Sequence, residues 1–348
     1  MKLLLLNYSM NARSTVFSHQ LEVAKRLSRH FEHTFVITAG EHLGEKGGDL
    51  EIQSSNWESG HSLKNAITFY RLVIPVILSQ RKDIVVFSHM TEVQSFLIAP
   101  LCRLLGIPHF LWYAHKSNSK YLRLSFPFLN GVITSTPGSC PIRSPKVHPI
   151  GQAIDIELFG IIQSLPNIPP LRWYHVGRLD ESKNIDLIIA VFCKLRGEGW
   201  DLKLDFYGSP SSNSAQTYFD TNLRKYLTKD NLDWLTFCGP IERARIPEIA
   251  SHHDGFVHAY QGSLDKAVLE AVICKRVIVS TNPEFENEFF SSISIHNSQF
   301  ENLTLQLGTV LEMSEDEQKA RIETFYNITK QNHSLDKWIG ALVEVITH

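Results

Sequence analysis

A single acid within an otherwise apolar helix is the first feature of this 348-residue sequence that suggests chemistry. Residues 266–273 read KAVLEAVI, so Glu270 lies among apolar side chains. A buried carboxylate is costly unless it is paired or hydrogen-bonded. Two vicinal hydroxyls of a ribose can both donate to one carboxylate, which predicts a binding role for Glu270. The alternative is a salt bridge to a neighbouring Arg or Lys.

The start of the same helix favours a bound anion. Ser263 is a suitable N-cap and Asp265 suits the positive end of the helix, whereas Lys266 in the first turn opposes the helix dipole. An anion at the helix start would explain this lysine, and Gly262 lets the backbone approach a ligand closely. The alternative is a lysine side chain that points into solvent.

A second pair of cations follows a strand. Residues 173–184 read WYHVGRLDESKN, in which Gly177 turns the chain and Arg178 and Lys183 follow within six residues. A guanidinium and an ammonium at the edge of a sheet can hold a diphosphate, the first as a fork and the second as a point charge. The alternative is a solvated loop with two surface cations.

The elements that must position these residues alternate between short apolar runs and longer amphipathic segments. Strands are expected at 3–6, 34–38, 83–88, 109–113, 172–176, 202–207, 235–238, 255–258 and 277–280. Helices are expected at 18–31, 63–78, 92–105, 184–196, 218–227, 246–251, 266–273 and 336–346. This alternation predicts an α/β protein whose parallel sheets are covered by helices on both faces.

The Pro-rich segment GIIQSLPNIPP at 160–170 is the best linker candidate, which predicts two doubly wound domains. We place their boundary between residues 160 and 161. Ligands of open α/β sheets bind at the carboxyl ends of the strands, so function is expected on strand-to-helix loops that face a central cleft.

Composition and missing motifs exclude several classes of protein. The net charge of −2 argues against a nucleic-acid binder, although residues 1–160 carry 16 Lys/Arg and 11 Asp/Glu while residues 161–348 carry 18 and 25. Rossmann G-x-G-x-x-G, P-loop and G-x-S-x-G patterns are absent. The five cysteines form no C-x-x-C pair, and His252–Asp254 have no partner cluster with ligand spacing, so no metal site is expected.

Several short motifs occur in an order that resembles a known family. These are VGRL…K, FYG, FCGPI and SLDKAVLEA in the second half, with VFSHQ (16–20), FSHM (87–90), LWYAHK (111–116) and IGQAID..LF (150–159) in the first. Together they resemble bacterial retaining GT-B glycosyltransferases of family 4, over nearly the whole chain. The resemblance implies a GT-B fold of two Rossmann-like domains. Residues 1–160 would bind the acceptor, residues 161–334 would bind a nucleotide-sugar donor, and the C-terminal helix 335–348 would cross back to the first domain.

The resemblance also implies roles for individual residues. Arg178 and Lys183 would hold the donor diphosphate and Glu270 the ribose, while His115, just past strand 109–113, would lie against the donor sugar. His115, Arg178 and Lys183 are thus the expected catalytic residues. The other donor-binding positions are Gly177, Gly208, Gly239, Pro240, Ile241, Gly262, Ser263, Leu264, Asp265 and Lys266. Asn11 and Arg13 are acceptor-side candidates by position alone.

One position departs from the family pattern. In the family's E-x7-E motif the first acid lies eight residues before the second, where this chain has Gly262. That acid normally contacts the donor sugar, and Asp265 is the nearest substitute.

The expected activity is transfer of a hexose from a nucleotide diphosphate-sugar to a hydroxyl of a glycan or lipid-linked acceptor. The resemblance implies retention of configuration, no metal, no cofactor, and a place in bacterial surface polysaccharide or lipopolysaccharide synthesis. Two alternatives are a nucleotide-sugar epimerase of the same fold and a non-catalytic nucleotide-sugar binding module.

One stretch of the first half is basic. Residues 103–146 hold six Lys/Arg and no acid, which predicts an approach to an anionic membrane surface; the alternative is an ordinary solvated basic face. We expect a cytoplasmic protein that is peripheral on the inner face of the cytoplasmic membrane.

Overall fold

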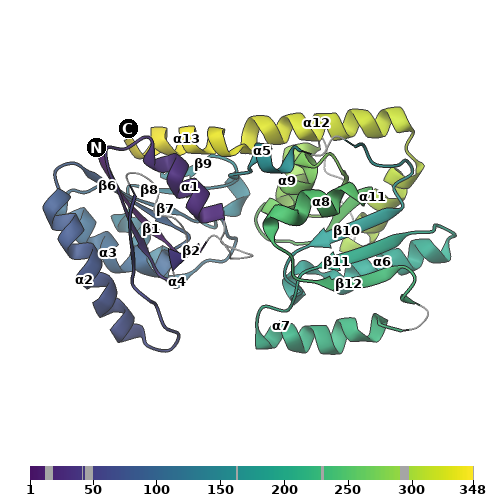
Figure 1. Ribbon diagram of the computed structural model, residues 1–348, viewed down its shortest axis with the longest axis horizontal. Helices are drawn as coiled ribbons and strands as arrows, with labels where there is room; N and C mark the ends of the chain where they lie inside the picture. Colours follow the sequence, from purple (N-terminus) through teal and green to yellow (C-terminus); the bar gives the residue numbers. More distant parts are fainter. Residues whose placement is uncertain are drawn as a thin grey trace. The chain divides into compact units, whose positions relative to one another are not determined.

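The chain folds into two compact units, each built on its own parallel sheet (Figure 1). The computed structural model describes residues 1–11, 19–40, 42–43, 50–161, 164–228, 231–290 and 298–347. Unit 1 comprises Met1–Ala153 with Leu335–His348, and unit 2 comprises Ile154–Ser334. The boundary lies at Ile154 rather than at 161 because Phe159 is buried in the core of unit 2, where its carbonyl accepts a hydrogen bond from the Cys274 thiol at 3.5 Å.

Unit 1 is built on a seven-stranded sheet in which every pair of neighbours is parallel. Its order is β5 (Leu50–Ser54), β3 (Thr34–Thr38), β1 (Lys2–Asn7), β6 (Ile84–His89), β7 (His109–Trp112), β8 (Gly131–Thr134) and β9 (Val147–Pro149). The two-residue strands β2 (Met10–Asn11) and β4 (His42–Leu43) pair with each other.

The four-leucine run of β1 shows why this sheet is covered on both faces. Leu3 and Leu5 belong to the apolar cluster that includes α1 (His19–Ser28) and α13 (Leu335–Thr347), whereas Leu4 and Leu6 pack with α2 (Ser62–Gln80) and α3 (Glu92–Leu105). Successive strand residues point to opposite faces, so a continuous apolar run requires a helix layer on each side. The short helix α4 (Lys120–Ser125) packs beside α3.

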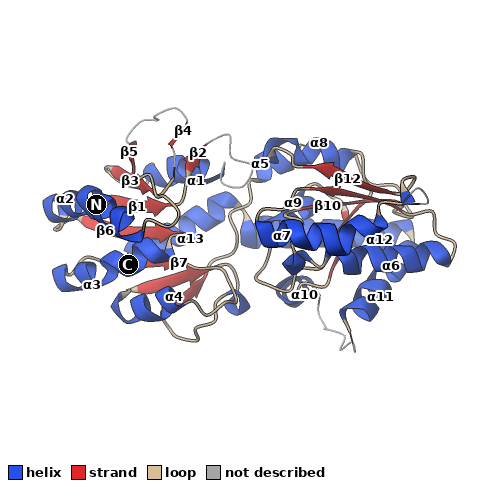
Figure 2. Ribbon diagram, turned by 90° about the horizontal axis from the view of Figure 1, so that it is seen from below, coloured by secondary structure: helices blue, strands red, loops and turns tan. Residues whose placement is uncertain are grey.

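Unit 2 contains a five-stranded parallel sheet (Figure 2). The order is β12 (Leu235–Gly239), β11 (Lys203–Tyr207), β10 (Arg172–Val176), β13 (Gly255–His258) and β14 (Val277–Ser280). The helices of this unit are α5 (Ile156–Phe159), α6 (Ile185–Gly197), α7 (Asn213–Tyr218), α8 (Ile246–Ser251), α9 (Lys266–Ile273), α10 (Pro283–Phe289), α11 (Gln299–Glu312) and α12 (Glu315–His333). Trp173 and Tyr174, adjacent on β10, lie in the two separate apolar clusters of this unit.

The Pro-rich segment is tied to unit 2 through one carboxylate. Asp254 accepts hydrogen bonds from the backbone N–H groups of Asn167, Leu171 and Arg172 at 2.9–3.1 Å.

His253, next to Asp254, also has a structural role, because its ring forms hydrogen bonds with Ile249 O at 2.7 Å and Asp205 Oδ2 at 3.0 Å. Among the residues that the structure describes, no group of three or more His, Cys, Asp or Glu side chains is arranged to hold a metal ion.

The predicted fold class is confirmed, with errors in some elements. The helix expected at 218–227 is wrong in place, since α7 begins at Asn213 and the chain from Phe219 to Tyr226 forms a π turn and a 3₁₀ turn. Strands β5, β8 and β9 and helices α10, α11 and α12 were not predicted. All five cysteines are free thiols: Cys102, Cys140 and Cys274 are buried, and Cys193 and Cys238 are exposed.

Candidate functional site

A cluster of charged residues in unit 2 lies where β10 and β13 end and α9 begins. Lys183, in a short 3₁₀ turn after β10, is almost fully buried, and its ammonium forms an ion pair with Asp265 Oδ2. The same Nζ lies 4.1 Å from the centre of the Tyr260 ring, a cation–π contact. Lys183, which was predicted to face a ligand, therefore already has an internal anion as its partner.

Asp265 is the N-cap of α9, and the prediction that Ser263 caps this helix is wrong. The helix begins at Lys266, so its cap is the residue immediately before, whose Oδ1 accepts the Ala267 N–H at 3.3 Å. Burial alone would raise the pKa of the Asp265 carboxyl, but the Lys183 charge and a hydrogen bond from His258 together hold it well below its ordinary value. The carboxyl is therefore ionised at neutral pH.

His258 connects this carboxylate to the sheet. Its Nε2 lies 3.3 Å from Asp265 Oδ2 and its Nδ1 lies 3.1 Å from Ser280 Oγ. Burial lowers the pKa of His258, so the ring is neutral, with the Nε2 proton directed at the carboxylate and Nδ1 accepting from the serine. The Asp265–His258–Ser280 chain is buried at the serine end, which suits a role in fixing Asp265 rather than nucleophilic catalysis.

Glu270 is buried, and the structure shows the ion-pair alternative. Its Oε1 accepts from Arg243 Nε at 2.9 Å and Nη2 at 2.6 Å, and the Arg243 guanidinium lies 4.8 Å from the centre of the Phe159 ring. Burial, followed by the nearby Arg243 charge, lowers the pKa of Lys266 to about 7, although Glu270 acts in the opposite direction. Lys266 is half-buried and close to this pair. Glu270 is therefore the carboxylate that offsets the charges of both Arg243 and Lys266.

Two of the predicted glycines allow close backbone approach. At Gly208, with φ of +152°, a Cβ atom would lie 1.7 Å from the Gly177 carbonyl oxygen, so no side chain fits. At Gly262 a Cβ would lie 2.0 Å from the tip of the Tyr260 ring, the same ring that covers Lys183. A glutamate at this position would displace Tyr260, which gives a physical reason for the absence of the first acid of the motif.

The remaining predicted donor residues lie around this cluster. Arg178 is exposed, with its Nε 3.4 Å from Asp180 Oδ2. Ser263 and Leu264 are buried. Gly239 is the last residue of β12, and Pro240 and Ile241 follow it. Gly177 donates its N–H to Tyr207 O at 3.0 Å, which joins the loops after β10 and β11.

Several residues in this cluster were missed from the sequence. Arg243 and His258 carried no recognisable motif. Asn282 is fully buried and donates to the carbonyls of Tyr260 at 2.7 Å and of Gly262 and Ser263 at 3.2 Å, which fixes the loop before α9. The Asn-Pro pair that opens α10 was an available signal for an N-cap at Asn282.

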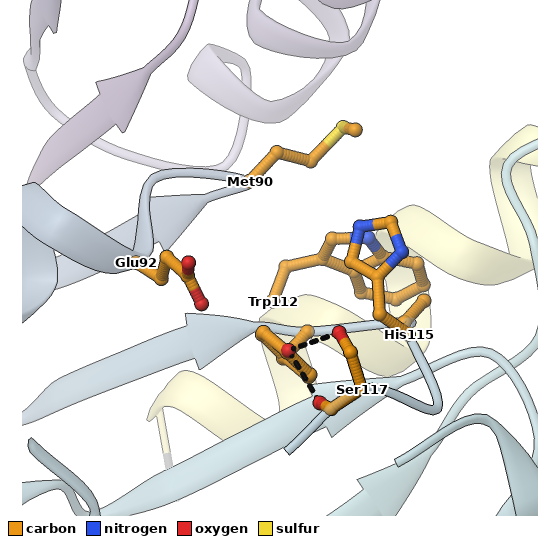
Figure 3. Close-up of a pocket in the computed structure, with 7 residues that line it drawn as sticks. Met90, Glu92, Trp112, His115 and Ser117 are labelled. Carbon is orange, nitrogen blue, oxygen red and sulfur yellow. Dashed lines mark hydrogen bonds between the residues drawn. The ribbon is translucent and has the colours of Figure 1, made fainter. Parts of the chain in front are cut away.

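Unit 1 holds a pocket of its own at the carboxyl ends of β6 and β7 (Figure 3). The cavity has a volume of about 290 Å³ and is lined by Met90, Glu92, Trp112, Tyr113, Ala114, His115 and Ser117. Glu92 enters it from the start of α3, and the exposed His115 from the loop after β7. His115 thus lies at the predicted sheet edge, and Glu92 was not predicted.

Of the acceptor-side candidates, Asn11 is not among the residues that line this pocket. Asn11 is half-buried in β2, where its backbone N–H lies 3.3 Å from Ser9 Oγ. Arg13 lies outside the described residues.

Comparisons with known proteins agree with this architecture. Residues 171–290, within unit 2, match the family model described as "Glycosyl transferases group 1". No curated protein matches the chain.

Solved structures are similar along the whole chain. Anabaena HepE in complex with UDP matches with a TM-score of 0.75 at 15% identity, covering 100% of both chains. A glycosyltransferase from Rickettsia africae matches with a TM-score of 0.74 at 13% identity, covering 99% of this chain and 98% of that chain. Sucrose-phosphate synthase from Thermosynechococcus elongatus matches with a TM-score of 0.76 at 11% identity, with coverage of 99% and 98%. The chain therefore has the GT-B glycosyltransferase fold, as predicted.

Proposed function

We propose that the protein is a glycosyltransferase that moves a hexose from a nucleotide diphosphate-sugar to a hydroxyl of a glycan or lipid-linked acceptor. The observation that carries the proposal is the match of residues 171–290 to the group 1 glycosyltransferases, which covers the cation cluster at the start of α9. The similar HepE structures hold UDP and UDP-glucose, which supports a nucleotide-sugar as the ligand of unit 2.

In this proposal the diphosphate binds at the start of α9. Lys266, Lys183 and the exposed Arg178 supply positive charge, and the first N–H groups of the helix supply donors. Lys183 is paired with Asp265 in the structure, so an incoming phosphate competes with that carboxylate for the same ammonium. Glu270 would accept the ribose hydroxyls through carboxylate capacity that Arg243 leaves unused, since Arg243 bonds only Oε1.

The proposed reaction proceeds with retention and without a metal ion. The leaving diphosphate helps to deprotonate the acceptor hydroxyl on the same face of the sugar, and His115 lies against the donor sugar. The protein then contributes positioning and stabilisation of the charge that develops on the leaving group. Lys183 and Lys266 are the cations that this step requires most.

A thermal-shift screen with UDP-, GDP- and ADP-sugars tests the proposal. A ligand at 100 times its dissociation constant adds about 2.7 kcal/mol of stability, which is readily measured. We expect one nucleotide class to raise the melting temperature, and Lys183→Met to weaken that ligand by at least tenfold. Asp265→Asn keeps a good N-cap residue and releases Lys183, so it should strengthen binding of the free nucleoside diphosphate. A flat response to every donor would reject the proposal.

A second candidate is a binding module without catalysis. It is favoured by two observations, the glycine at position 262 and the internal ion pair that occupies Lys183. This candidate predicts a thermal shift with a nucleotide-sugar but no release of the nucleotide over hours, either alone or with acceptors.

The proposed setting is the synthesis of bacterial surface polysaccharide or lipopolysaccharide, at the cytoplasmic face of the membrane. The six basic residues that support it are all exposed: Arg103, Lys116, Lys120, Arg123, Arg143 and Lys146. Leu104, Leu124 and Phe128 in the same stretch are exposed apolar side chains. A stretch of chain that exposes both basic and apolar side chains suits anionic lipid headgroups. Within the described parts of the chain, no helix is both long and apolar enough to cross a membrane.

A further inference from the structure

A carboxylate in the unit 1 pocket has a buried oxygen that lacks a hydrogen bond. Glu92 is the first residue of α3, and its Oε2 is inaccessible to solvent and has no hydrogen-bond partner among the described residues. The positive end of the helix stabilises the charge of a carboxylate at this position. The hydrogen bond that a buried carboxylate oxygen requires is nevertheless not supplied by any residue that the structure describes.

The Tyr113 hydroxyl does not supply it. Tyr113 lies in the same pocket, and its hydroxyl donates its single proton to Ser117 O at 2.7 Å. Burial raises the pKa of Tyr113 and the nearby Glu92 charge acts in the same direction, so the phenol stays neutral. Since no described residue donates to this oxygen, a bound molecule or water can act as its donor.

The turn that delivers Glu92 to the pocket is conformationally strained. Met90, directly after β6, has φ of +61°, a left-handed conformation that costs energy for a residue with a side chain. Its Sδ lies 3.6 Å from Nε2 of the fully buried Gln20, a contact that helps to hold the turn. Strain that the surroundings maintain is commonly found at binding and catalytic sites.

The remaining lining suits a small polyhydroxylated ligand. His115 adds an imidazole to the carboxylate, and Trp112 and Met90 add apolar surface (Figure 3). A volume of about 290 Å³ is close to the lower limit of about 300 Å³ for small-molecule sites, which favours one sugar ring over an extended chain. Glu92 has no cationic partner among the residues described, and such a carboxylate favours hydroxyl donors over phosphate groups.

We propose that Glu92 binds a hydroxyl group of the acceptor sugar in this pocket and so selects the acceptor. This inference rests on the proposed function, because it assigns to the acceptor a site in the unit that does not carry the donor cluster. Glu92 is a binding residue that accepts a hydrogen bond from the sugar.

Saturation-transfer NMR with methyl glycosides of glucose, galactose, mannose and N-acetylglucosamine tests the inference directly. We expect the wild-type protein to bind at least one of them, and Glu92→Ala to weaken that ligand by about 10- to 100-fold, as for loss of a hydrogen bond to a charged group. Glu92→Gln keeps the size of the side chain and an acceptor oxygen but loses the charge, so an intermediate loss is expected.

Glu301→Gln is the matched control. Glu301 is an exposed acid in the first turn of α11, which has 14 residues like α3, so this variant should bind the glycoside normally. Absence of glycoside binding by the wild type, or equal binding by Glu92→Ala, overturns the inference.

The nucleotide-induced thermal shift is measured on the same variants. A normal shift in Glu92→Ala together with lost glycoside binding supports the inference. A protein that binds the glycoside through Glu92 but shows no nucleotide shift would reject the proposed donor and leave the Glu92 site standing, so the two failures can be distinguished.

Discussion

The Lys266 ammonium is held in an environment that is unfavourable for the fold and useful for binding an anion. It opposes the dipole of α9, lies beside Arg243 and shares with it a single carboxylate, Glu270. Burial and the Arg243 charge lower the pKa of Lys266 to about 7, so this environment disfavours the ammonium. A residue that serves ligand binding is expected to lower the stability of the folded protein locally.

Lys266→Met should therefore stabilise the empty protein while weakening nucleotide binding. Because the folded pKa is lowered from 10.5 to about 7, the unfolded chain binds more protons between these values, and wild-type stability rises with pH across that window. The gain from Lys266→Met should be largest at and below pH 7 and shrink towards pH 10. Melting temperatures of both proteins at pH 7 and pH 9.5 measure this difference.

Lys337→Met is the control for that experiment, since Lys337 is an exposed lysine in the first turn of α13. It should leave the melting temperature nearly unchanged at both pH values. A Lys266→Met protein that melts below the wild type at pH 7 would contradict the interpretation of Lys266 as a strained cation.

The sequence predicted which residues form the donor cluster better than it predicted their hydrogen-bond and ion-pair partners. Lys183, Asp265 and Lys266 follow strands or open a helix, and parallel topology brings such positions to one edge. The pairing of Glu270 with Arg243 depends on how a loop 27 residues away folds back, which no local pattern encodes. Glu92 was missed because a single acid at the start of a helix is common and its unsatisfied oxygen is visible only in three dimensions.

Among the elements, α13 connects the end of the chain to the pocket of unit 1. Trp338 is almost fully buried, and its ring centre lies 5.3 Å from that of Trp112, 5.8 Å from that of His89 and 6.4 Å from that of Phe87. Trp112 in turn lines the pocket that contains Glu92. The last helix therefore supports one wall of the proposed acceptor site.

Trp338→Ala should destabilise unit 1 and loosen this wall. Loss of a buried Trp side chain costs about 3–5 kcal/mol, which corresponds to a fall of about 10 °C in melting temperature for a unit of this size. Calorimetry should show the fall, and glycoside binding should weaken with it. The neighbouring exposed Lys337→Ala serves as the comparison, and an unchanged Trp338→Ala transition would exclude α13 as a stabilising element.

Elements were predicted well where apolar residues recur with a regular period. Helices α3, α8 and α9 were predicted at their observed bounds for this reason. Helix α12 was missed because several of its buried positions are polar, including Gln318, Thr329 and His333, so its apolar stripe is interrupted. Helix α7 was misplaced because the polar residues 211–214, which read SSNS, resemble a loop although the helix begins at Asn213.

For the whole molecule, the charge of the two halves differs more than the net charge suggests. Residues 1–160 carry an excess of basic residues, and residues 161–348 an excess of acidic residues. In the second half, the cations proposed to bind the diphosphate are paired with acids or partly buried. In the stretch 103–146, the basic side chains are exposed. The basic side chains of this stretch are therefore accessible to an anionic partner.

Co-sedimentation with vesicles tests this surface. The protein should bind vesicles that contain phosphatidylglycerol at low salt, and binding should fall at 0.5 M salt because surface charges are then screened. Substituting both Lys120 and Arg123 by Gln should reduce binding, whereas vesicles of phosphatidylcholine alone should not bind. Equal binding of the protein to both lipids would exclude an electrostatic membrane contact.

The distribution of thiols has a practical consequence. Cys193 and Cys238 are the exposed cysteines, both belong to unit 2, and the two cysteines of unit 1 are buried. A maleimide fluorophore should accordingly attach to unit 2 alone in the unmodified protein. Fluorescence from such a label would follow events in the nucleotide-binding half separately from those around the tryptophans Trp112 and Trp338 of the other half, without any engineered cysteine.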